Sequence, residues 1–253
     1  MRARVRNSGF LAATAALLAL ARPAAAQPDT LRVYGPGGPQ GPMQEAADSF
    51  ARAQGVPVRV VAGPEAQWLE RAKLNADLVF GGAEYMLTQF ALAHPGLLDE
   101  RSRVSLYERP AGILVRKGNP KRIRTLADLA RPGVRLVDVA GAGQLGLWED
   151  LAGRAGLTAG LQRNVARSVR SSAEAIALWK QDPTLDAWIT YESWHYRLRD
   201  GTALVRLPEG ERLYRGTPIA ITARSTQRAR AEQFVRFLRS EAGHAIFRRW
   251  GWR

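Results

Sequence analysis

Two glycine-rich turns in this chain have the residue types and the spacing of anion-binding loops. The central one is Gly141-Ala142-Gly143-Gln144-Leu145-Gly146, which follows an apolar, strand-like run and precedes a helix-forming segment. The first backbone N–H groups of a helix have no partner within the helix, and the helix dipole adds partial positive charge at the same end. A strand, a glycine turn and a helix start in this order therefore predict a site for a small anion.

The other turn has the same setting near the start of the chain. Residues 31–34 form a strand-like run, residues 35–39 read Gly-Pro-Gly-Gly-Pro, and apolar residues then recur at one-face helical spacing. One such unit in each half of the chain is typical of two similar α/β lobes. If the lobes face each other, both helix starts point into one cleft, where their N–H groups would receive a small anion.

Apolar, β-branched runs predict strands at residues 58–62, 77–80, 107–116, 134–139, 186–190 and 213–222. The first of these alternate with helix-forming segments, which favours a doubly wound α/β sheet. Ligands of open α/β sheets bind at the carboxyl ends of the strands. Residues near those ends are therefore the candidates for ligand contact.

Several polar side chains stand near these predicted strands. Gln67 and Trp68 could donate an amide and an indole N–H to a ligand, although Trp68 suits a core position equally well. Arg109 and Arg215 begin later strands, and a guanidinium forms paired hydrogen bonds to a carboxylate, sulfate or phosphate. Pairing with a surface acid such as Glu108 is the alternative role for Arg109.

Two adjacent serines precede another predicted helix. Ser171 or Ser172 is placed to cap that helix, with Glu174 three residues after Ser171 as the partner in a capping box. The capping role is the favoured one. A hydroxyl at a helix start inside the cleft could also contact the ligand.

The N-terminus has the pattern of a secretory signal peptide. Three arginines precede an apolar run at residues 10–20, and Ala24-Ala25-Ala26 supplies a cleavage signal. The run is too short for a stable membrane anchor. We therefore expect residues 1–26 to be removed and the mature protein to be periplasmic. The chain has no cysteine, which excludes disulfides, thiolate catalysis and cysteine-ligated metals.

The formal net charge of +14 suits anionic partners in general. The densest basic cluster, at residues 116–124, surrounds a turn and has no interleaved aromatic residues to stack bases, so we expect no nucleic-acid binding. The three histidines are isolated, and neither a nucleophile elbow nor a Walker lysine is present. The sequence therefore predicts neither an enzyme nor a cofactor.

The central turn also matches the dinucleotide fingerprint G-x-G-x-x-G. A dinucleotide enzyme is disfavoured because no acidic residue follows about 20 positions later, where the fingerprint requires one. An exported adhesin or interaction protein with a vestigial cleft is the alternative class; loss of Arg109 and Arg215 would have suggested it, and both are present.

The chain resembles the accessory colonization factor C family of type II periplasmic binding proteins over essentially its whole mature length. The matching stretches are YGPGGP (34–39), Gly63-Pro64 with Trp68, KLNAD (73–77), VRKGNP (115–120), GAGQLGLWED (141–150), SAEA (172–175), DAWI (186–189) and WGW (250–252). The resemblance implies an α/β fold of two Rossmann-like lobes joined by two crossover strands, with the ligand cleft between them. The expected lobes are residues 27–108 with 218–253, and residues 109–217.

The resemblance also implies a periplasmic solute-binding protein for ABC uptake or chemoreception. Its expected ligands are small oxyanions or carboxylates, such as sulfate, phosphorylated three-carbon acids or citrate, and its partner is an ABC permease or a chemoreceptor; homodimerisation is left open. The residues carried over as ligand contacts are Gly37, Gly38, Gln67, Trp68, Gly82, Arg109, Gly143, Gln144, Gly146, Ser171, Ser172 and Arg215. No metal site is implied.

Overall fold

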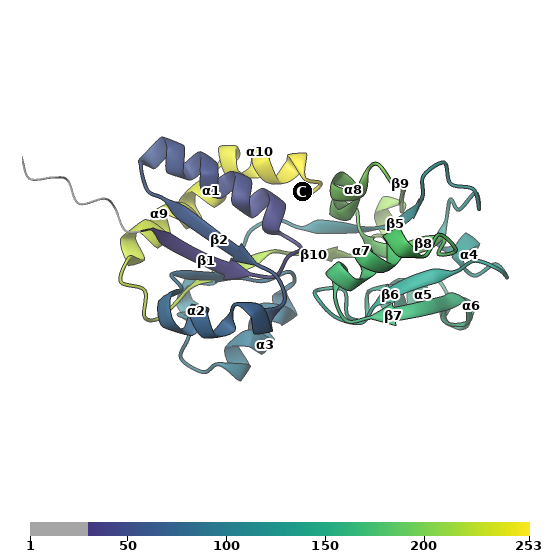
Figure 1. Cartoon of the computed structure of the whole chain (residues 1–253), viewed down its shortest axis with the longest axis horizontal. Helices are drawn as coiled ribbons and strands as arrows, with labels where there is room; N and C mark the ends of the chain where they lie inside the picture. Colours follow the sequence, from purple (N-terminus) through teal and green to yellow (C-terminus); the bar gives the residue numbers. More distant parts are fainter. Residues whose placement is uncertain (1–29) are drawn as a thin grey trace, which may run out of the picture.

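The computed structural model describes residues 30–253, and these form two α/β lobes that lie side by side along the long axis of the molecule (Figure 1). We call the lobe that begins the chain lobe 1 and the other lobe 2, each defined by its own sheet. The predicted signal peptide, residues 1–26, lies outside the described residues. None of the helices within residues 30–253 combines the length and apolar character that a membrane crossing needs.

Lobe 1 contains a five-stranded sheet in the order β2-β1-β3-β11-β4. Its strands are β1 (Leu31–Gly35), β2 (Val58–Ala62), β3 (Leu78–Phe80), β4 (Val104–Ser105) and β11 (Pro218–Ile221). β1 is parallel to β2 and β3, and β11 is antiparallel to both of its neighbours. The helices of this lobe are α1 (Gln40–Gln54), α2 (Leu69–Asn75), α3 (Glu84–Ala93), α9 (Arg228–Leu238) and α10 (Glu241–Arg249), with 3-10 turns at Glu65–Gln67 and Glu100–Ser102.

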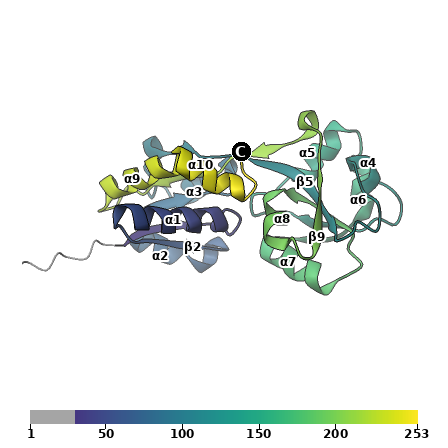
Figure 2. The same cartoon turned by 90° about the horizontal axis from the view of Figure 1, so that it is seen from above.

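Successive side chains of β1 are buried on opposite faces of this sheet, because the side chains of a strand alternate with a period of two residues. Leu31 and Val33 pack in one cluster with Phe50 of α1 and Phe234 of α9. Tyr34 packs in a second cluster, which contains residues of α2 and α3. The sheet therefore lies between two layers of helices, with α1, α9 and α10 on one face (Figure 2).

Lobe 2 contains a second sheet in the order β10-β5-β8-β6-β7, with β9 also paired to β5. Its strands are β5 (Arg109–Arg116), β6 (Leu136–Val139), β7 (Val165–Val169), β8 (Ala187–Tyr191), β9 (Thr202–Arg206) and β10 (Tyr214–Arg215). Its helices are α4 (Leu126–Leu129), α5 (Leu147–Arg154), α6 (Thr158–Asn164), α7 (Ser172–Gln181) and α8 (Ser193–Leu198), with a 3-10 turn at Glu209–Glu211. One continuous apolar cluster around Trp188 forms its core.

The two lobes are joined by two neighbouring segments, one from β4 to β5 and one from β10 to β11 (Figure 1). The predicted single strand at residues 213–222 is therefore wrong. It is two strands, because the chain leaves the sheet of lobe 2 at Arg215 and joins the sheet of lobe 1 at Pro218. Gly216 lies between them, where the backbone N–H donates to Glu84 at 3.0 Å and a Cβ would collide with that carboxylate. The predicted two-lobe α/β architecture with two crossovers is confirmed.

The core of lobe 1 allows a direct test of this packing. Leu238 of α9 is 0% exposed, whereas Leu92 of α3 is 75% exposed. We expect Leu238→Ala to lower the free energy of unfolding by about 2–5 kcal/mol, because it removes buried methyl groups and leaves a cavity. The same change at Leu92 should shift it by less than about 0.5 kcal/mol. Urea denaturation of the mature protein measures both, and equal effects would contradict the fold.

Candidate functional site

A cavity of about 550 Å³ lies between the lobes, and the loops that follow parallel strands build its wall. Lobe 1 contributes residues that follow β1, β2 and β3, and lobe 2 contributes residues that follow β6, β7 and β8. The polar or small members of this wall are Gly37, Gly38, Gln40, Ala62, Gly63, Glu65, Gln67, Gly81, Ala142, Arg170, Ser171, Ser172, Ala173 and Arg197. The cavity therefore has the position at the carboxyl ends of strands in which open α/β sheets bind ligands.

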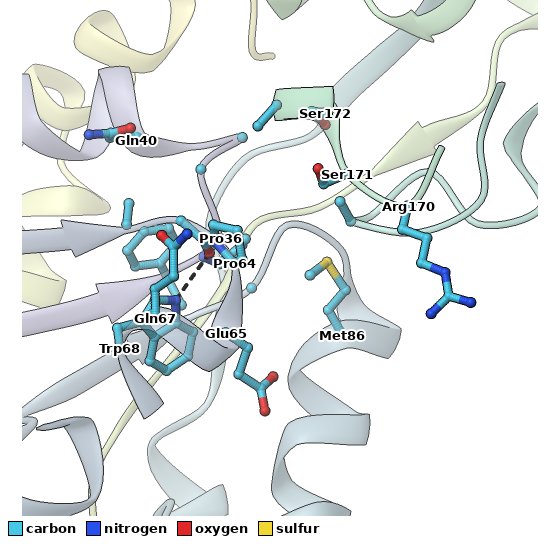
Figure 3. Close-up of a pocket in the computed structure, with 18 of the residues that line it drawn as sticks. Pro36, Gln40, Pro64, Glu65, Gln67, Trp68, Met86, Arg170, Ser171 and Ser172 are labelled. Atoms are coloured by element: carbon cyan, nitrogen blue, oxygen red, sulfur yellow. Dashed lines mark hydrogen bonds between the residues drawn. The ribbon is translucent and has the colours of Figure 1, made fainter. Parts of the chain in front are cut away.

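Two helix starts, one from each lobe, reach this cavity. Gly37 and Gly38 lead into α1, whose first turn receives no hydrogen bond from a capping side chain. Ser171 and Ser172 begin α7 from the opposite side. In Figure 3, Gln67 and Trp68 of lobe 1 lie across from Ser171 and Ser172 of lobe 2. The positive dipole ends of α1 and α7 thus converge on one space. At the start of α1 the N–H of Gln40 already donates to the carbonyl oxygen of Gly37 at 3.4 Å, and Pro42 has no N–H.

The two serines differ in what their hydroxyl groups do. Ser171 Oγ accepts from the backbone N–H of Glu174 at 3.2 Å and donates to Glu174 Oε1 at 2.9 Å. The other carboxylate oxygen of Glu174 accepts from the backbone N–H of Arg170 at 3.2 Å. Ser171 is therefore the helix cap that the sequence predicts, and its hydroxyl proton is used within its own helix.

The hydroxyl of Ser172 is hydrogen-bonded to a buried side chain of lobe 2. Its Oγ accepts from Nε2 of Gln144 at 2.9 Å, and Oε1 of Gln144 accepts from Nε1 of Trp188 at 3.2 Å. Gln144 is buried and does not reach the cavity wall, so its predicted direct ligand contact is corrected to a contact with Ser172. Ser172 makes no hydrogen bond as a donor to any residue in the described part of the chain, which leaves its proton for the cavity.

Trp68 lines the cavity with its ring rather than with its N–H group. Its Nε1 donates to the carbonyl oxygen of Gly63 at 3.1 Å (Figure 3). Trp68 is 4% exposed, and its ring lies 6.0 Å from that of Tyr34 and 5.7 Å from that of Phe90. The prediction that the indole N–H of Trp68 donates to a ligand is therefore wrong, because this N–H already donates to the carbonyl oxygen of Gly63. Gln67 is exposed in the wall of the cavity.

Arg109 lies behind the wall of the cavity and not in it. It is 1% exposed, donates to the carbonyl oxygen of Gly82, and places its guanidinium 4.0 Å from the ring centroid of Tyr191. A Cβ added to Gly38 would lie 3.1 Å from its Nη1 atom, so the guanidinium lies next to a residue that lines the cavity. Burial lowers the pKa of Arg109. No carboxylate among residues 30–253 forms an ion pair with it.

The glycines of the central turn do not line the cavity, and Gly143 packs against lobe 1. Gly143 has a φ of +86°, and a Cβ there would lie 3.0 Å from the carbonyl oxygen of Gly82 in lobe 1. The hydroxyl of Tyr191 donates to Gly143, and the N–H of Leu145 donates to the hydroxyl of Tyr85 at 3.3 Å. Ala142 is the member of this turn that lines the cavity. Neither Gly143 nor Gly146 lines the cavity, and Gly143 packs against Gly82 of lobe 1, so their contact with an anion stays a prediction.

Arg215 also lies outside the cavity wall. Its Nη2 atom is 3.1 Å from Oδ2 of Asp150 at the start of α5, which is the surface pairing that an arginine of this kind can adopt. The twelve predicted contacts thus divide equally. Those that line the cavity are Gly37, Gly38, Gln67, Trp68, Ser171 and Ser172, and those that do not are Gly82, Arg109, Gly143, Gln144, Gly146 and Arg215.

Helix α8 contributes to the cavity, which no sequence pattern predicted. Arg197 lines the cavity, donates to the carbonyl oxygen of Gly37 in lobe 1 at 3.0 Å, and stacks 4.8 Å from the ring centroid of Trp194. Both residues follow β8, so the rule that ligands bind beyond strand ends could have found them. The sequence also missed Met86, Arg170 and Glu65. Glu65 is bonded to Nε2 of His94 at 3.2 Å.

No group of three or more histidine, aspartate or glutamate side chains that could hold a metal ion occurs within residues 30–253. The site instead offers hydrogen-bond donors, two arginines and one carboxylate in its wall, with an aromatic and aliphatic floor. This arrangement can bind a small anion that also carries a carbon skeleton.

Comparison with known proteins identifies the family. The model of the family described as bacterial extracellular solute-binding protein matches residues 31–253. The chain belongs to this family of bacterial extracellular solute-binding proteins. Peb3 from Campylobacter jejuni is 32% identical, with a TM-score of 0.80, over 88% of this chain and 99% of that chain. The crystal structure of L-phospholactate-bound PEB3 gives a TM-score of 0.82 at the same identity and coverage.

Other relatives place the fold among type II periplasmic binding proteins, as expected from the resemblance. The molybdate-binding protein ModA of Mycobacterium tuberculosis is 26% identical over 190 residues, which are 68% of this chain and 71% of that protein. The sulfate-binding protein SubI of Mycobacterium tuberculosis has a TM-score of 0.73 at 22% identity, over 88% of this chain and 86% of that chain. The predicted membership of a periplasmic solute-binding family is confirmed.

The capping role of Ser171 can be tested by stability alone. We expect Ser171→Ala to lower the free energy of unfolding by about 1 kcal/mol, because an N–H group of α7 loses its partner. Ser171→Thr is the matched control, since threonine keeps the capping hydroxyl and should retain most of that stability. Thermal unfolding of the ligand-free protein measures both. An alanine variant as stable as the wild type would show that this hydroxyl does not cap α7.

Proposed function

We propose that the cavity between α1 and α7 captures a small organic anion in the periplasm. The observation that carries this proposal is the convergence of two helix starts from different lobes on one space, with the free hydroxyl of Ser172 and the guanidinium of Arg197 in the same wall. An anion placed there would receive hydrogen bonds from both lobes at once. Gly37, Gly38, Gln67 and Ser172 are the proposed polar contacts.

The size and lining of the cavity support an organic anion over a bare inorganic one. About 550 Å³ lies within the range of pockets that hold small organic ligands. The apolar part of the wall includes Trp68, Met86, Phe90, Ile176 and Trp194. A carbon skeleton would cover these side chains, while a carboxylate or phosphate group would meet the helix starts. The phospholactate bound to PEB3 is an anion of this class.

The buried charge of Arg109 supports a negatively charged ligand. A buried cation without an ion-pair partner is unfavourable in the empty protein. Glu84 acts on this charge from a distance, and an anion beyond Gly38 would add a second negative charge close to it. Arg109 is therefore proposed to act on the ligand through the field of its charge, without direct contact.

Ligand capture is proposed to stabilise the closed arrangement of the lobes. Arg197 to Gly37, Leu145 to Tyr85 and Arg109 to Gly82 are contacts from lobe 2 to lobe 1. A ligand that bonds to both lobes adds to these contacts only when the lobes are closed, and it therefore shifts the equilibrium toward closure. We place the hinge in the two segments that join the predicted lobes, residues 27–108 with 218–253 and residues 109–217.

The closed form would then deliver its ligand to an ABC permease or signal to a chemoreceptor, without catalysis by this chain. A signal peptide at residues 1–26 and a periplasmic location belong to the same proposal. They fit a family of extracellular solute-binding proteins. Homodimerisation is not needed for this mechanism, since both helix starts come from one chain.

A thermal-shift panel on the mature protein tests the proposed function. The panel contains sulfate, phosphate, 3-phosphoglycerate, L-phospholactate, citrate and the dicarboxylic amino acids. An anion present at about 1,000 times its dissociation constant should stabilise the protein by about 4 kcal/mol, which raises the midpoint on the order of ten degrees. We expect organic anions to give the largest shifts. A panel without any shift would contradict the anion-binding function.

Arg109→Met tests whether the buried charge of Arg109 acts on the ligand. Methionine is also unbranched and removes the charge, but it leaves the carbonyl group of Gly82 without this donor, so the ligand-free protein should be less stable than the wild type. The affinity for the best anion of the panel should fall about tenfold or more, because the counter-charge is lost. Arg116→Met is the matched control, since Arg116 bonds to carbonyl groups in lobe 2 away from the cavity. Unchanged affinity in the Arg109 variant would remove Arg109 from the binding mechanism.

A further inference from the structure

The densest basic cluster of the sequence lies at the end of lobe 2 that is remote from lobe 1. The loop between β5 and α4 carries most of it, and α4 lies at that end of the molecule (Figure 1). Its exposed cations are Lys117, Lys121, Arg122, Arg124 and, after α4, Arg131. We call these five side chains the basic tip. None of them lines the cavity between the lobes, so the proposed capture of a small anion does not use them.

Short-range hydrogen bonds hold the loop of the basic tip in one conformation. The side chain of Asn119 donates to the carbonyl oxygen of Ile123 at 2.8 Å and accepts from the N–H of Ile123 at 2.9 Å. Ile123 is fully buried and anchors the loop in the core of lobe 2. The backbone N–H of Arg122 donates to the carbonyl oxygen of Asn119 at 2.9 Å. A partner therefore meets cations on an ordered backbone, which lowers the entropic cost of binding.

Three cations of the basic tip have no partner in the described part of the chain. The side chains of Lys117, Arg122 and Arg124 form neither an ion pair nor a hydrogen bond there. Asp128 is the only acid between residues 116 and 135, and its carboxylate already accepts from two backbone N–H groups. Like charges thus remain uncompensated along the loop, and a negatively charged partner would stabilise them.

The backbone of Arg122 gives an independent indication that this loop has a partner. Its φ is +52°, in the left-handed region that disfavours residues with a Cβ. Asparagine or glycine adopts this conformation more readily. The exposed side chain of Arg122 makes no bond within the described chain that would offset the strain. Such strain is typical of functional positions, so we look for the contribution of this guanidinium outside the chain.

The surface around the basic tip indicates the kind of partner. Interfaces between proteins have an apolar centre, but the exposed neighbours of these cations are glycine, proline, alanine and threonine. The large exposed apolar side chains of the described residues, Leu74, Leu92 and Leu145, lie on other elements. The loop also lacks the aromatic side chains that stack nucleic-acid bases. Charge without apolar anchors suits a layer of anionic phospholipid headgroups, which attracts clustered lysine and arginine without insertion.

We propose that the basic tip docks the protein on an anionic phospholipid surface through the end of lobe 2. Each lysine or arginine near such a surface strengthens binding about fivefold. The attachment is electrostatic, so it is reversible and weakens as the ionic strength rises. Because the basic tip lies away from lobe 1, a protein docked in this way keeps its interlobe cavity clear of the membrane (Figure 1).

Vesicle sedimentation with the mature protein tests this inference. Vesicles of phosphatidylglycerol mixed with phosphatidylcholine are compared with vesicles of phosphatidylcholine alone. The wild type should bind the anionic vesicles, leave them at high salt and ignore the neutral ones. Combined substitution of Lys117, Arg122 and Arg124 by glutamine should weaken binding about a hundredfold. The thermal midpoint of this triple variant should match the wild type, since the three side chains make no bonds within the described chain.

A matched control removes the same charge from lobe 1. Arg59, Arg236 and Arg239 are exposed and form no ion pair within the described residues, and their combined substitution by glutamine should leave vesicle affinity within about threefold of the wild type.

Arg122→Asn separates binding from stability. This single change should weaken vesicle binding about fivefold. It should leave the protein at least as stable as the wild type, because asparagine adopts the left-handed region more readily.

Each contrary result has a definite meaning. Absence of binding to the anionic vesicles would overturn the inference and leave the basic tip as a solvated loop. Equal losses in the two triple variants would overturn it as well, because net charge rather than the basic tip would then drive binding. Binding to soluble poly-L-glutamate but not to vesicles, lost in the triple variant of the basic tip, would replace the lipid surface by an acidic protein. The thermal-shift panel tests anion capture in the cavity separately from all of these results.

Discussion

The buried positive charge of Arg109 is the constraint on which the junction between the lobes depends. It begins β5, the strand by which the chain enters lobe 2, and it touches Gly82 of lobe 1 and Tyr191 of lobe 2. A charge so far from water requires acceptors around it, and the carbonyl of Gly82 and the ring face of Tyr191 supply part of them. Tyr191 in turn bonds to the glycine turn at Gly143, so one cation organises both sides of the junction.

The same constraint explains why small residues surround Arg109. A side chain at Gly38 would approach the guanidinium, and one at Gly143 would meet the carbonyl of Gly82. The backbone at Gly38 therefore lies beside the charge, and the helix start of α1 is the group that we propose to meet the ligand. Arg109, Arg197 and the two helix starts give the cavity positive potential, and the polar contacts that we propose for the ligand are Gly37, Gly38, Gln67 and Ser172.

The direction of those donors gives the cavity its chemistry. Ser171 and Ser172 are neighbours at the same helix start, but their hydroxyl groups have different partners. Ser171 caps α7 through the backbone N–H of Glu174, whereas Ser172 accepts a hydrogen bond from Gln144. A cavity with hydrogen-bond donors at one end and an apolar floor suits the organic anion that we propose as its ligand.

The sequence by itself determined the family, the two-lobe α/β architecture and the loops that follow the strands, because these depend on local periodicity, on glycine positions and on motifs read in order. It also predicted the cap of α7, which involves residues three apart. Only the tertiary structure decided the roles of individual candidates. The sequence predicted that Gly143, Arg109 and Gln144 contact the ligand, but each of them contacts a residue distant in the chain. Gly143 packs against Gly82, the guanidinium of Arg109 lies over the ring of Tyr191, and Gln144 accepts a hydrogen bond from Trp188. Which hydrogen-bonding group remains free for a ligand depends on these long-range partners, and no local pattern encodes them.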